Sequence, residues 1–410
     1  MTTTEAQGSA VETSPESSTE SRPTQSTQAK KVGKVEVLRS ALAQALNAVG
    51  MATPARTPRP QFMCIRMEAK KLSKKSTLVL SATDAEVWIE QVIDDVDVHV
   101  DGACLVPAAE FRSIVNASIS ETLTIELLPT GCIIRDMDGT FELMGYDHKD
   151  LPPMPVLSRD EMEVVASEVS VQDFLACIDR TKYALSAETS RYAVAAALLK
   201  FDGKSMVMAA TDGRRLSVAT MDTECEATAG VLVGSKAIGI LQKILSGAGG
   251  KFSFAHSKVI FKAKLEYEDG SSLSVATNLI EGTFPPYAEA IPKDQPILAK
   301  VSRALLQSAM KRAHILTNAE SRGVRMTFDP DKKTLTVAGR APERGSSSVE
   351  CPIAEYRGEK LEICVDPRFV LQALENMSDE LVTIEMTAFN KPAVFRHNGF
   401  LCMIMCMNLV

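Results

Sequence analysis

Residues 210–216, Ala-Thr-Asp-Gly-Arg-Arg-Leu, have a counterpart about 130 positions earlier in residues 82–87, Ala-Thr-Asp-Ala-Glu-Val. A weaker counterpart, Ala338-Gly339-Arg340, follows at about the same distance. A pattern that returns at one spacing indicates an internal repeat. The chain has 410 residues, and at roughly 150 residues per domain it has room for two or three domains. We therefore expect three copies of one unit.

Other predicted elements recur in the same order around these stretches. Segments with apolar residues at helical spacing begin near Val37, Val171 and Ser302. A strand runs into a second helix at residues 105–111, 232–238 and 364–370. Alternating strands then close each unit, starting at residues 122–127, 251–254 and 381–386. This order predicts an α+β fold in which two helices cover antiparallel sheets. The alternative is three unrelated α+β domains. The shared order and spacing of the elements favour a repeat over this alternative.

Composition shifts divide the chain. Residues 1–31 are rich in Thr, Ser, Glu, Gln and Pro, and with almost no large apolar side chain they predict a disordered tail. Prolines near residues 152–155 and 292–296 predict boundaries between units. The expected domains are residues 32–160, 161–295 and 296–410.

The overall composition indicates a cytoplasmic protein. No stretch approaches the roughly 18 consecutive apolar residues of a spanning helix, and no apolar signal segment begins the chain, so no membrane association is expected. The nine cysteines lack CxxC spacing and lie mostly in apolar runs, which favours buried reduced thiols over disulfides or zinc.

Signatures of enzymatic chemistry are lacking. The five histidines are far apart and form no HExxH pair. Gly203-Lys204-Ser205 ends like a phosphate-binding loop, but Leu198 stands where its first glycine should be, so Asp202-Gly203 is better explained as a hairpin turn. Asp84 and Asp212 are expected to be equivalent turn residues rather than a catalytic pair. We expect no metal and no cofactor. An enzyme of unknown class remains an alternative.

Charge is distributed unevenly between predicted elements. The chain carries 45 Lys and Arg against 52 Asp and Glu, a net charge of −7, which by itself argues against a nucleic-acid partner. The six predicted helices reverse that sign, with ten basic and five acidic residues. Ordinary solvated helix faces could explain this excess. If the helices all face one way, their charges instead add up along a phosphate backbone.

Several segments together resemble a known family. They are residues 210–216, Arg191-Tyr192 before the strand at 196–199, Phe284-Pro285-Pro286-Tyr287, residues 321–325 and the Met-rich C-terminus. In this combination the chain resembles the bacterial DNA polymerase III beta subunits, the sliding clamps, over residues 32–410. The resemblance implies three DNA-clamp domains per chain, each with two helices packed on antiparallel sheets. It also implies a closed ring formed by a head-to-tail homodimer, with helices lining the central hole.

The resemblance further implies a processivity factor without catalytic activity. Its partners would be duplex DNA, encircled without regard to sequence, and the DNA polymerase III alpha subunit, the clamp loader and repair polymerases, which bind through short peptide motifs. A ring needs only weak phosphate contacts, because topology prevents its loss from DNA. A protein-binding scaffold that does not bind DNA is the remaining alternative.

The resemblance also implies functional residues. Those facing DNA would be Arg56, Arg191, Tyr192 and Lys236. Two departures, Ala109 and Glu110, stand where the family carries a basic residue in the first unit.

A peptide pocket is implied between the second and third domains. Its residues would be Val194, Thr211, Gly213, Arg214, Arg215, Leu216, Pro285, Asp366, Phe369, Pro392, Met403, Ile404, Met405, Met407 and Leu409. Flexible Met side chains suit a pocket that accepts several partners. The residues themselves leave open that the Met-rich tail is a buried edge of the last sheet. Cys406, Asn408 and Glu289 depart from the family pattern.

Ring closure is implied at Ile315 and Leu316, which would pack against the first unit of the neighbouring chain. The alternative is that both residues belong to the core of their own domain.

Overall fold

The computed structural model of the chain describes residues 32–71, 75–94, 96–186, 195–225, 230–317 and 323–408. The expected disordered tail, residues 1–31, lies outside these ranges. So do four of the expected site residues, Arg191, Tyr192, Val194 and Leu409.

Each repeat contains a strand, a helix, further strands, a second helix and three closing strands. The first repeat consists of β1 (Gly33–Leu38), α1 (Arg39–Val49), β2 (Cys64–Lys71), β3 (Ser76–Thr83), β4 (Val87–Ile93), β5 (Val96–Val100), β6 (Gly102–Pro107), α2 (Ala108–Ala117), β7 (Thr122–Leu128), β8 (Gly131–Arg135) and β9 (Thr140–Met144).

The second repeat has the same order. It consists of β10 (Val164–Val169), α3 (Val171–Lys182), β11 (Ala196–Phe201), β12 (Ser205–Thr211), β13 (Arg215–Asp222), β14 (Gly230–Gly234), α4 (Ser235–Leu245), β15 (Lys251–His256), β16 (Ile260–Glu266) and β17 (Ser272–Asn278). As predicted, Asp202-Gly203 forms the hairpin turn between β11 and β12, with Gly203 at a φ of 92°.

After a short helix, α5 (Tyr287–Ala290), the third repeat follows. It consists of β18 (Ile297–Ser302), α6 (Arg303–His314), β19 (Val324–Asp329), β20 (Thr334–Ala341), β21 (Gly345–Arg357), β22 (Leu361–Val365), α7 (Pro367–Glu375), β23 (Leu381–Met386), β24 (Ala393–His397) and β25 (Phe400–Ile404). The long strand β21 occupies the positions of both β4 and β5.

The first helix begins later than its apolar pattern predicts. The prediction that this helix begins near Val37 is wrong, because β1 continues to Leu38 and α1 begins at Arg39. Val37 pairs with Leu123 of β7 and with Val96 of β5, so the strand ladder holds its backbone extended. Within α1 the buried residues Leu42, Ala45, Leu46 and Val49 follow the helical period and face the core.

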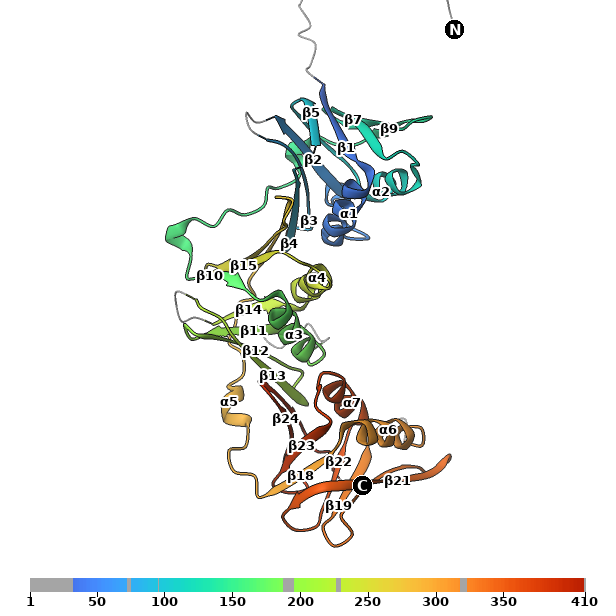
Figure 1. Cartoon of the computed structure of the whole chain (residues 1–410), viewed down its shortest axis with the longest axis vertical. Helices are drawn as coiled ribbons and strands as arrows, with labels where there is room; N and C mark the ends of the chain where they lie inside the picture. Colours follow the sequence, from blue (N-terminus) through green and yellow to red (C-terminus); the bar gives the residue numbers. More distant parts are fainter. Residues whose placement is uncertain are drawn as a thin grey trace, which may run out of the picture. The chain divides into compact units, whose positions relative to one another are not determined.

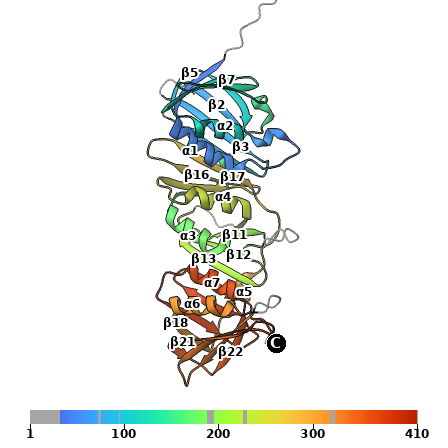
Figure 2. The same cartoon turned by 90° about the vertical axis from the view of Figure 1, so that its right-hand side faces the viewer.

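The helices pair within each repeat and lie on one face of the sheets. α1 packs with α2, α3 with α4 and α6 with α7. Figure 1 shows these six helices on one side of the strands and α5 on the other, and Figure 2 shows the molecule from the side of the six helices. The first helix of each repeat packs on equivalent strands, α1 on β4, α3 on β13 and α6 on β21.

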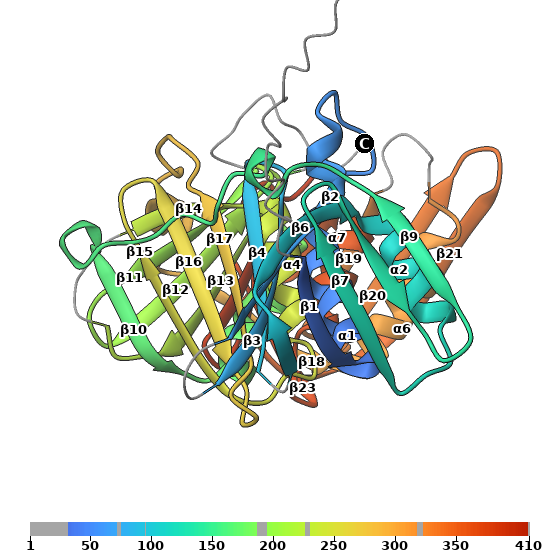
Figure 3. The ribbon, with the colours of Figure 1, turned by 90° about the horizontal axis from the view of Figure 1, so that it is seen from above.

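Strand pairing joins consecutive repeats. β17 of the second repeat pairs with β4 of the first in an eight-stranded sheet, and Figure 3 shows β16, β17 and β4 side by side. β25 of the third repeat pairs with β13 of the second in a twelve-stranded sheet. The boundary between repeats is therefore a continuous ladder of backbone hydrogen bonds.

All nine cysteines lie in the described ranges, none of them forms a disulfide, and seven are buried. Burial raises the pKa of Cys177 to about 12 and that of Cys402 to about 11. These thiols are therefore protonated at neutral pH and act as small core residues.

Candidate functional site

The two motifs that define the repeat form the same turn. Thr211 Oγ1 donates to the carbonyl oxygen of Arg215 at 2.6 Å, and Asp212 Oδ1 accepts from the amides of Arg214 and Arg215 at 2.9 and 3.0 Å. The first repeat has the same bonds, from Thr83 to Val87 and from Glu86 and Val87 to Asp84. As predicted, these carboxylates shape turns.

The central residue of each turn has a positive φ. It is 84° at Gly213 and 72° at Ala85, a left-handed conformation that costs a side-chain-bearing residue more than glycine. The residue after each positive-φ position also accepts an equivalent backbone hydrogen bond from the following repeat. The amide of Met405 donates to Arg214 at 2.9 Å, as the amide of Asn278 donates to Glu86 at 3.1 Å. The two repeat boundaries are therefore equivalent positions that can be compared residue by residue.

An apolar patch lies at the second boundary. Leu216 lies opposite Met403, which lies opposite Val394, so three neighbouring strands place their side chains on one face. These three residues and Leu401 form one buried cluster, against which Val218, Tyr287 and Ile291 pack. The structure thus brings two expected pocket residues, Leu216 and Met403, together in one apolar cluster.

The first boundary lacks such a patch. Trp88 takes the place of Leu216, Ala276 that of Met403, and Lys262 that of Val394. An aromatic ring, a methyl group and a cation do not make an aliphatic surface. Of these two equivalent positions, only the second boundary presents an apolar face.

The C-terminal segment contributes in two ways. Met403 and Ile404 belong to β25, which pairs on both sides and is therefore an interior strand rather than an edge of the sheet. Met405 follows the strand and is 42% exposed. Met407 donates its amide to the carbonyl oxygen of Cys364 at 2.7 Å, which holds the chain beyond β25 against β22. The tail is thus partly buried sheet and partly surface.

A second apolar cluster adjoins the patch. Ala196, Ala209, Leu232 and Phe284 are buried together, and Tyr287 and Val218 pack against both clusters. Beside it lies a cavity of about 390 Å³, lined by residues 282–289 with Leu198, Lys200 and Leu232. The expected residue Pro285 lines this cavity, so it lies next to the patch, with Tyr287 between them.

Arg215 has a different environment from the apolar patch. Arg215 is only 8% exposed. Its guanidinium donates hydrogen bonds to Asp212 Oδ2 at 3.0 Å, to Gln372 Oε1 of α7 and to the carbonyl oxygen of Tyr183. It also lies over the ring of Phe369, 4.3 Å from the centroid. Arg215 therefore ties β13 to α7 and to the end of α3, and Phe369 is part of that contact.

Other expected pocket residues lie around this contact. Asp366 caps the N-terminus of α7, where it accepts from the amide and the side chain of Arg368. Pro392 is half-buried in the turn before β24, and Arg214 is exposed. None of these three residues belongs to the apolar patch.

The described residues expected to face DNA are on the surface. Arg56 is exposed in the loop that follows α1. Lys236, in the first turn of α4, forms an ion pair with Asp84 of the first repeat, and Asp84 is itself held by its turn. Burial lowers the pKa of Lys236 from its ordinary value. The predicted DNA contact of Lys236 is thus also a contact between repeats.

The six longer helices carry ten basic and four acidic residues, since Asp366 precedes α7 as its cap. Arg112, Lys243 and Lys311 are exposed on them. The excess of positive charge therefore lies on the side of the sheets that the helices cover.

The described ranges contain neither a membrane-spanning helix nor a metal-binding cluster. Within them no helix is long and apolar enough to cross a membrane. Within the same ranges, no group of three or more His, Cys, Asp or Glu side chains could hold a metal ion.

Comparison with known sequences identifies the repeats. Sequence models of the DNA polymerase III beta subunit match consecutive parts of the chain: the N-terminal domain at residues 34–155, the central domain at 168–286 and the C-terminal domain at 288–400. The chain belongs to the DNA polymerase III beta subunit family. Its repeats are three clamp domains, and its function is that of a sliding clamp.

Individual relatives agree with this assignment. The beta sliding clamp of Chlamydia trachomatis is 27% identical over 89% of this chain and 84% of its own length. In fold the chain is similar to the clamp of Pseudomonas aeruginosa bound to griselimycin, with a TM-score of 0.83 at 22% identity, and to that of Bacillus subtilis, with 0.84 at 19%. Both alignments cover 92% of this chain and all of the other.

Replacing Arg215 tests its structural role. In Arg215→Leu, Asp212, Gln372 and the Tyr183 carbonyl lose their buried cationic partner, so the free energy of unfolding should fall by about 3 kcal/mol. The exposed neighbour is the control: Arg214→Leu should change it by less than about 0.5 kcal/mol. Urea unfolding followed by circular dichroism measures both. Equal stabilities of the two variants would contradict the role assigned to Arg215.

Proposed function

We propose that two copies of the chain close head to tail around duplex DNA in the cytoplasm, without catalytic activity of their own. In this proposal the apolar patch between the second and third repeats holds short peptide segments of the replicative polymerase's alpha subunit, the clamp loader and repair polymerases. The observation that carries the proposal is the strand pairing between repeats, because it leaves one open edge at each end of the series.

The open edges are equivalent to the paired ones. β9 has the place that β17 and β25 have in their repeats, and β21 begins in the place of β4 and β13. β17 pairs with β4, and β25 with β13. Among the described strands, β9 pairs only with β8, and residues 345–352 of β21 pair only with β20. A second copy can therefore offer β21 to β9 with the geometry already used twice, and two such contacts close a ring.

Apolar side chains accompany both edges. Phe141 and Met144 on β9 are 39% and 70% exposed. Ile315, which follows α6, is 71% exposed, and Leu316 is half-buried. Exposed Ile315 is therefore poorly explained as a core residue of its own domain. Unpaired strands with apolar neighbours are typical of surfaces that pair with another chain. The sequence does not identify Phe141 and Met144 as interface residues, because an alternating pattern predicts a strand but not whether its edge is unpaired.

Introducing a charge at exposed apolar residues of the proposed interface tests ring closure. Ile315→Asp and Phe141→Asp each place a carboxylate in the proposed interface and should shift the oligomer from dimer to monomer, with a dissociation constant raised at least about tenfold. Val259→Asp, at an exposed apolar position in a turn of the second repeat, should leave the dimer unchanged. Native mass spectrometry at several concentrations distinguishes these outcomes. A dimer in all three variants would contradict the proposed contact.

DNA contacts in this proposal are weak and independent of sequence. The basic excess lies on the helices, and the acidic remainder gives the chain its net charge of −7. A central hole lined by the helices would attract phosphates, and the rest of the surface would repel them. The proposed contacts are Arg56, Arg191, Tyr192 and Lys236, all four taken from the family resemblance. Such a surface suits sliding, because no single phosphate is held tightly.

Topology gives a direct test on DNA. Once loaded on closed circular duplex by a clamp loader, the dimer should stay bound at moderate salt, although screening weakens each phosphate contact. Cutting the circle once should release it within the time of sliding to an end. Gel filtration of the DNA before and after cutting measures retention. Equal retention on circular and linear DNA would show that affinity, rather than encirclement, holds the protein.

The peptide site is supported by the patch and by its exposed rim. Leu216, Val394 and Met403 are shielded by Tyr287 and Ile291, while Met405 is open to solvent beside them. Apolar peptide side chains would enter beside Met405, next to the cavity at Pro285. Met405 and Met407 are unbranched and adaptable, which allows several partner sequences to use one site.

The double variant Met405→Asp, Met407→Asp tests this site. Two carboxylates at its rim should weaken binding of a labelled peptide containing Leu-Leu-Phe at least about tenfold, because apolar residues would meet charges. The dimer should be intact, since neither residue lies on β9 or β21. Met137→Asp, at an exposed Met of the first repeat, is the control. Fluorescence polarisation reads out affinity, and unchanged binding by the double variant would refute the site.

A further inference from the structure

We propose that the peptide site continues across the third repeat into a polar cavity, and that this cavity takes an acidic segment flanking the partner's apolar motif. The inference rests on the proposed peptide-binding function and adds a second, chemically different part to the same site. It follows from a row of residues across the sheet, from an unpartnered amide and from the charges that surround that amide.

The row connects the apolar patch to the cavity. Residues opposite one another on adjacent strands share a face of the sheet. Here six strands in succession contribute one residue each, in the order Leu216, Met403, Val394, Glu385, Leu298 and Arg357. The first three form the apolar patch, and the last three line a cavity of about 550 Å³. The cavity is therefore the direct continuation of the patch on the same face.

Gln295 gives the cavity an unmet hydrogen-bonding group. It lies in the segment between α5 and β18, and both its Oε1 and Nε2 are buried without a partner among the described residues. A buried amide without a partner is costly, typically about 1–3 kcal/mol. A peptide group satisfies it completely, since its C=O accepts from Nε2 and its N–H donates to Oε1. An extended peptide in the cavity would supply such groups.

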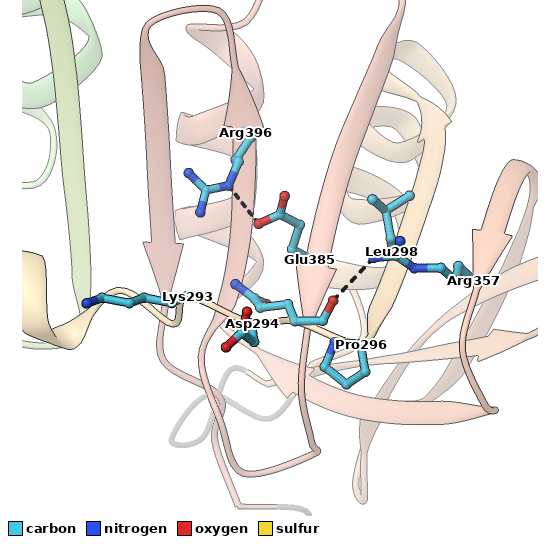
Figure 4. Close-up of a pocket in the computed structure, with 8 residues that line it drawn as sticks. Lys293, Asp294, Pro296, Leu298, Arg357, Glu385 and Arg396 are labelled. Carbon is cyan, nitrogen blue, oxygen red and sulfur yellow. Dashed lines mark hydrogen bonds and ion pairs between the residues drawn. The ribbon is translucent and has the colours of Figure 1, made fainter.

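The charges around Gln295 favour an acidic side chain. Arg396 is neutralised by Glu385, with Nε 2.6 Å from Oε2, as Figure 4 shows. Arg357 Nη2 donates only a long hydrogen bond, 3.5 Å, to the carbonyl oxygen of Gln295, and Lys293 is exposed. No carboxylate of the described residues forms an ion pair with either one. With Asp294 also at the cavity, the five charged residues sum to one positive charge.

The strand spacing sets the distance between the two parts. Four strand steps separate Met403 from Arg357, which at ~4.8 Å per step is ~19 Å. An extended peptide rises ~3.3 Å per residue, so an acidic residue about six positions from the apolar motif would reach Arg357. The proposed ligand is therefore a peptide of two parts, apolar and acidic, joined by a short extended spacer.

Matched peptides test the inference on the full-length chain. Each carries Leu-Leu-Phe, then a spacer of five Gly and Ser residues on one side or the other, ending in Glu-Glu or Gln-Gln. In the preferred direction the Glu-Glu peptide should bind about fivefold more tightly than its Gln-Gln twin, the range of one exposed ion pair. That advantage should shrink at high salt. If the Glu-Glu and Gln-Gln peptides bind with equal affinity whichever side of Leu-Leu-Phe carries the spacer, the proposal is overturned.

Variants locate the effect in the cavity. Arg357→Glu should abolish the advantage of Glu-Glu, whereas Lys332→Glu, the same change of charge at an exposed turn outside the cavity, should preserve it. Gln295→Leu removes the unpartnered amide, so it should fold at least as stably as the parent chain and bind both spacer peptides less tightly, leaving Leu-Leu-Phe alone unaffected. If Arg357→Glu and Lys332→Glu behave alike, or Gln295→Leu binds the spacer peptides as the parent does, the cavity is not a subsite.

The same assay separates this inference from the function on which it rests. If Leu-Leu-Phe alone does not bind the parent chain, the peptide function itself fails. A second outcome is that the Leu-Leu-Phe peptide binds the parent chain and binds the Met405→Asp, Met407→Asp variant more weakly. If an acidic extension then does not increase its affinity, only the subsite fails.

Discussion

Backbone pairing between consecutive repeats is the interaction on which the rest of the structure depends. The second and third repeats each end in a strand that completes the sheet of the preceding one, β17 beside β4 and β25 beside β13. Main-chain hydrogen bonds set the register, and the register decides which side chains meet. The apolar patch, the polar cavity and the open edges are all consequences of this one arrangement.

Equivalent positions in the repeats serve different purposes. The turn of Thr, Asp and a residue of positive φ is kept at both boundaries, because it starts the strand that accepts the next repeat. The side chains that follow it are free to differ: Leu216 belongs to an aliphatic cluster, whereas Trp88 lies opposite Ala276, which lies opposite Lys262. A repeated backbone thus allows one boundary to specialise while the other remains structural.

Much of the fold can be predicted from the sequence, because repeated motifs and periodicity are local signals. The turn role of Asp84 and Asp212 and the α+β order are read from the chain. Local patterns fail where distant segments compete, as at Val37, where two neighbouring strands hold a helical pattern extended.

The site is less accessible to such reasoning. Family resemblance selects Arg215 and Leu216 together, yet one is locked against α7 and the other faces the patch, since adjacent strand residues point to opposite faces. Gln295 has no distinctive context in the sequence, and its buried amide is evident only once β18, β21 and the preceding segment meet. The roles of the residues in both parts of the site remain predictions.

The side chains that reinforce the two boundaries differ in their access to water. At the first, Lys236 and Asp84 form an ion pair whose lysine is partly exposed, and at the second, Arg215 is enclosed by rings and carbonyl groups. Salt screens exposed charges far more than enclosed ones. Rising ionic strength therefore weakens the ion pair at the first boundary more than the contacts of Arg215 at the second, so the side-chain reinforcement of the two boundaries depends differently on salt.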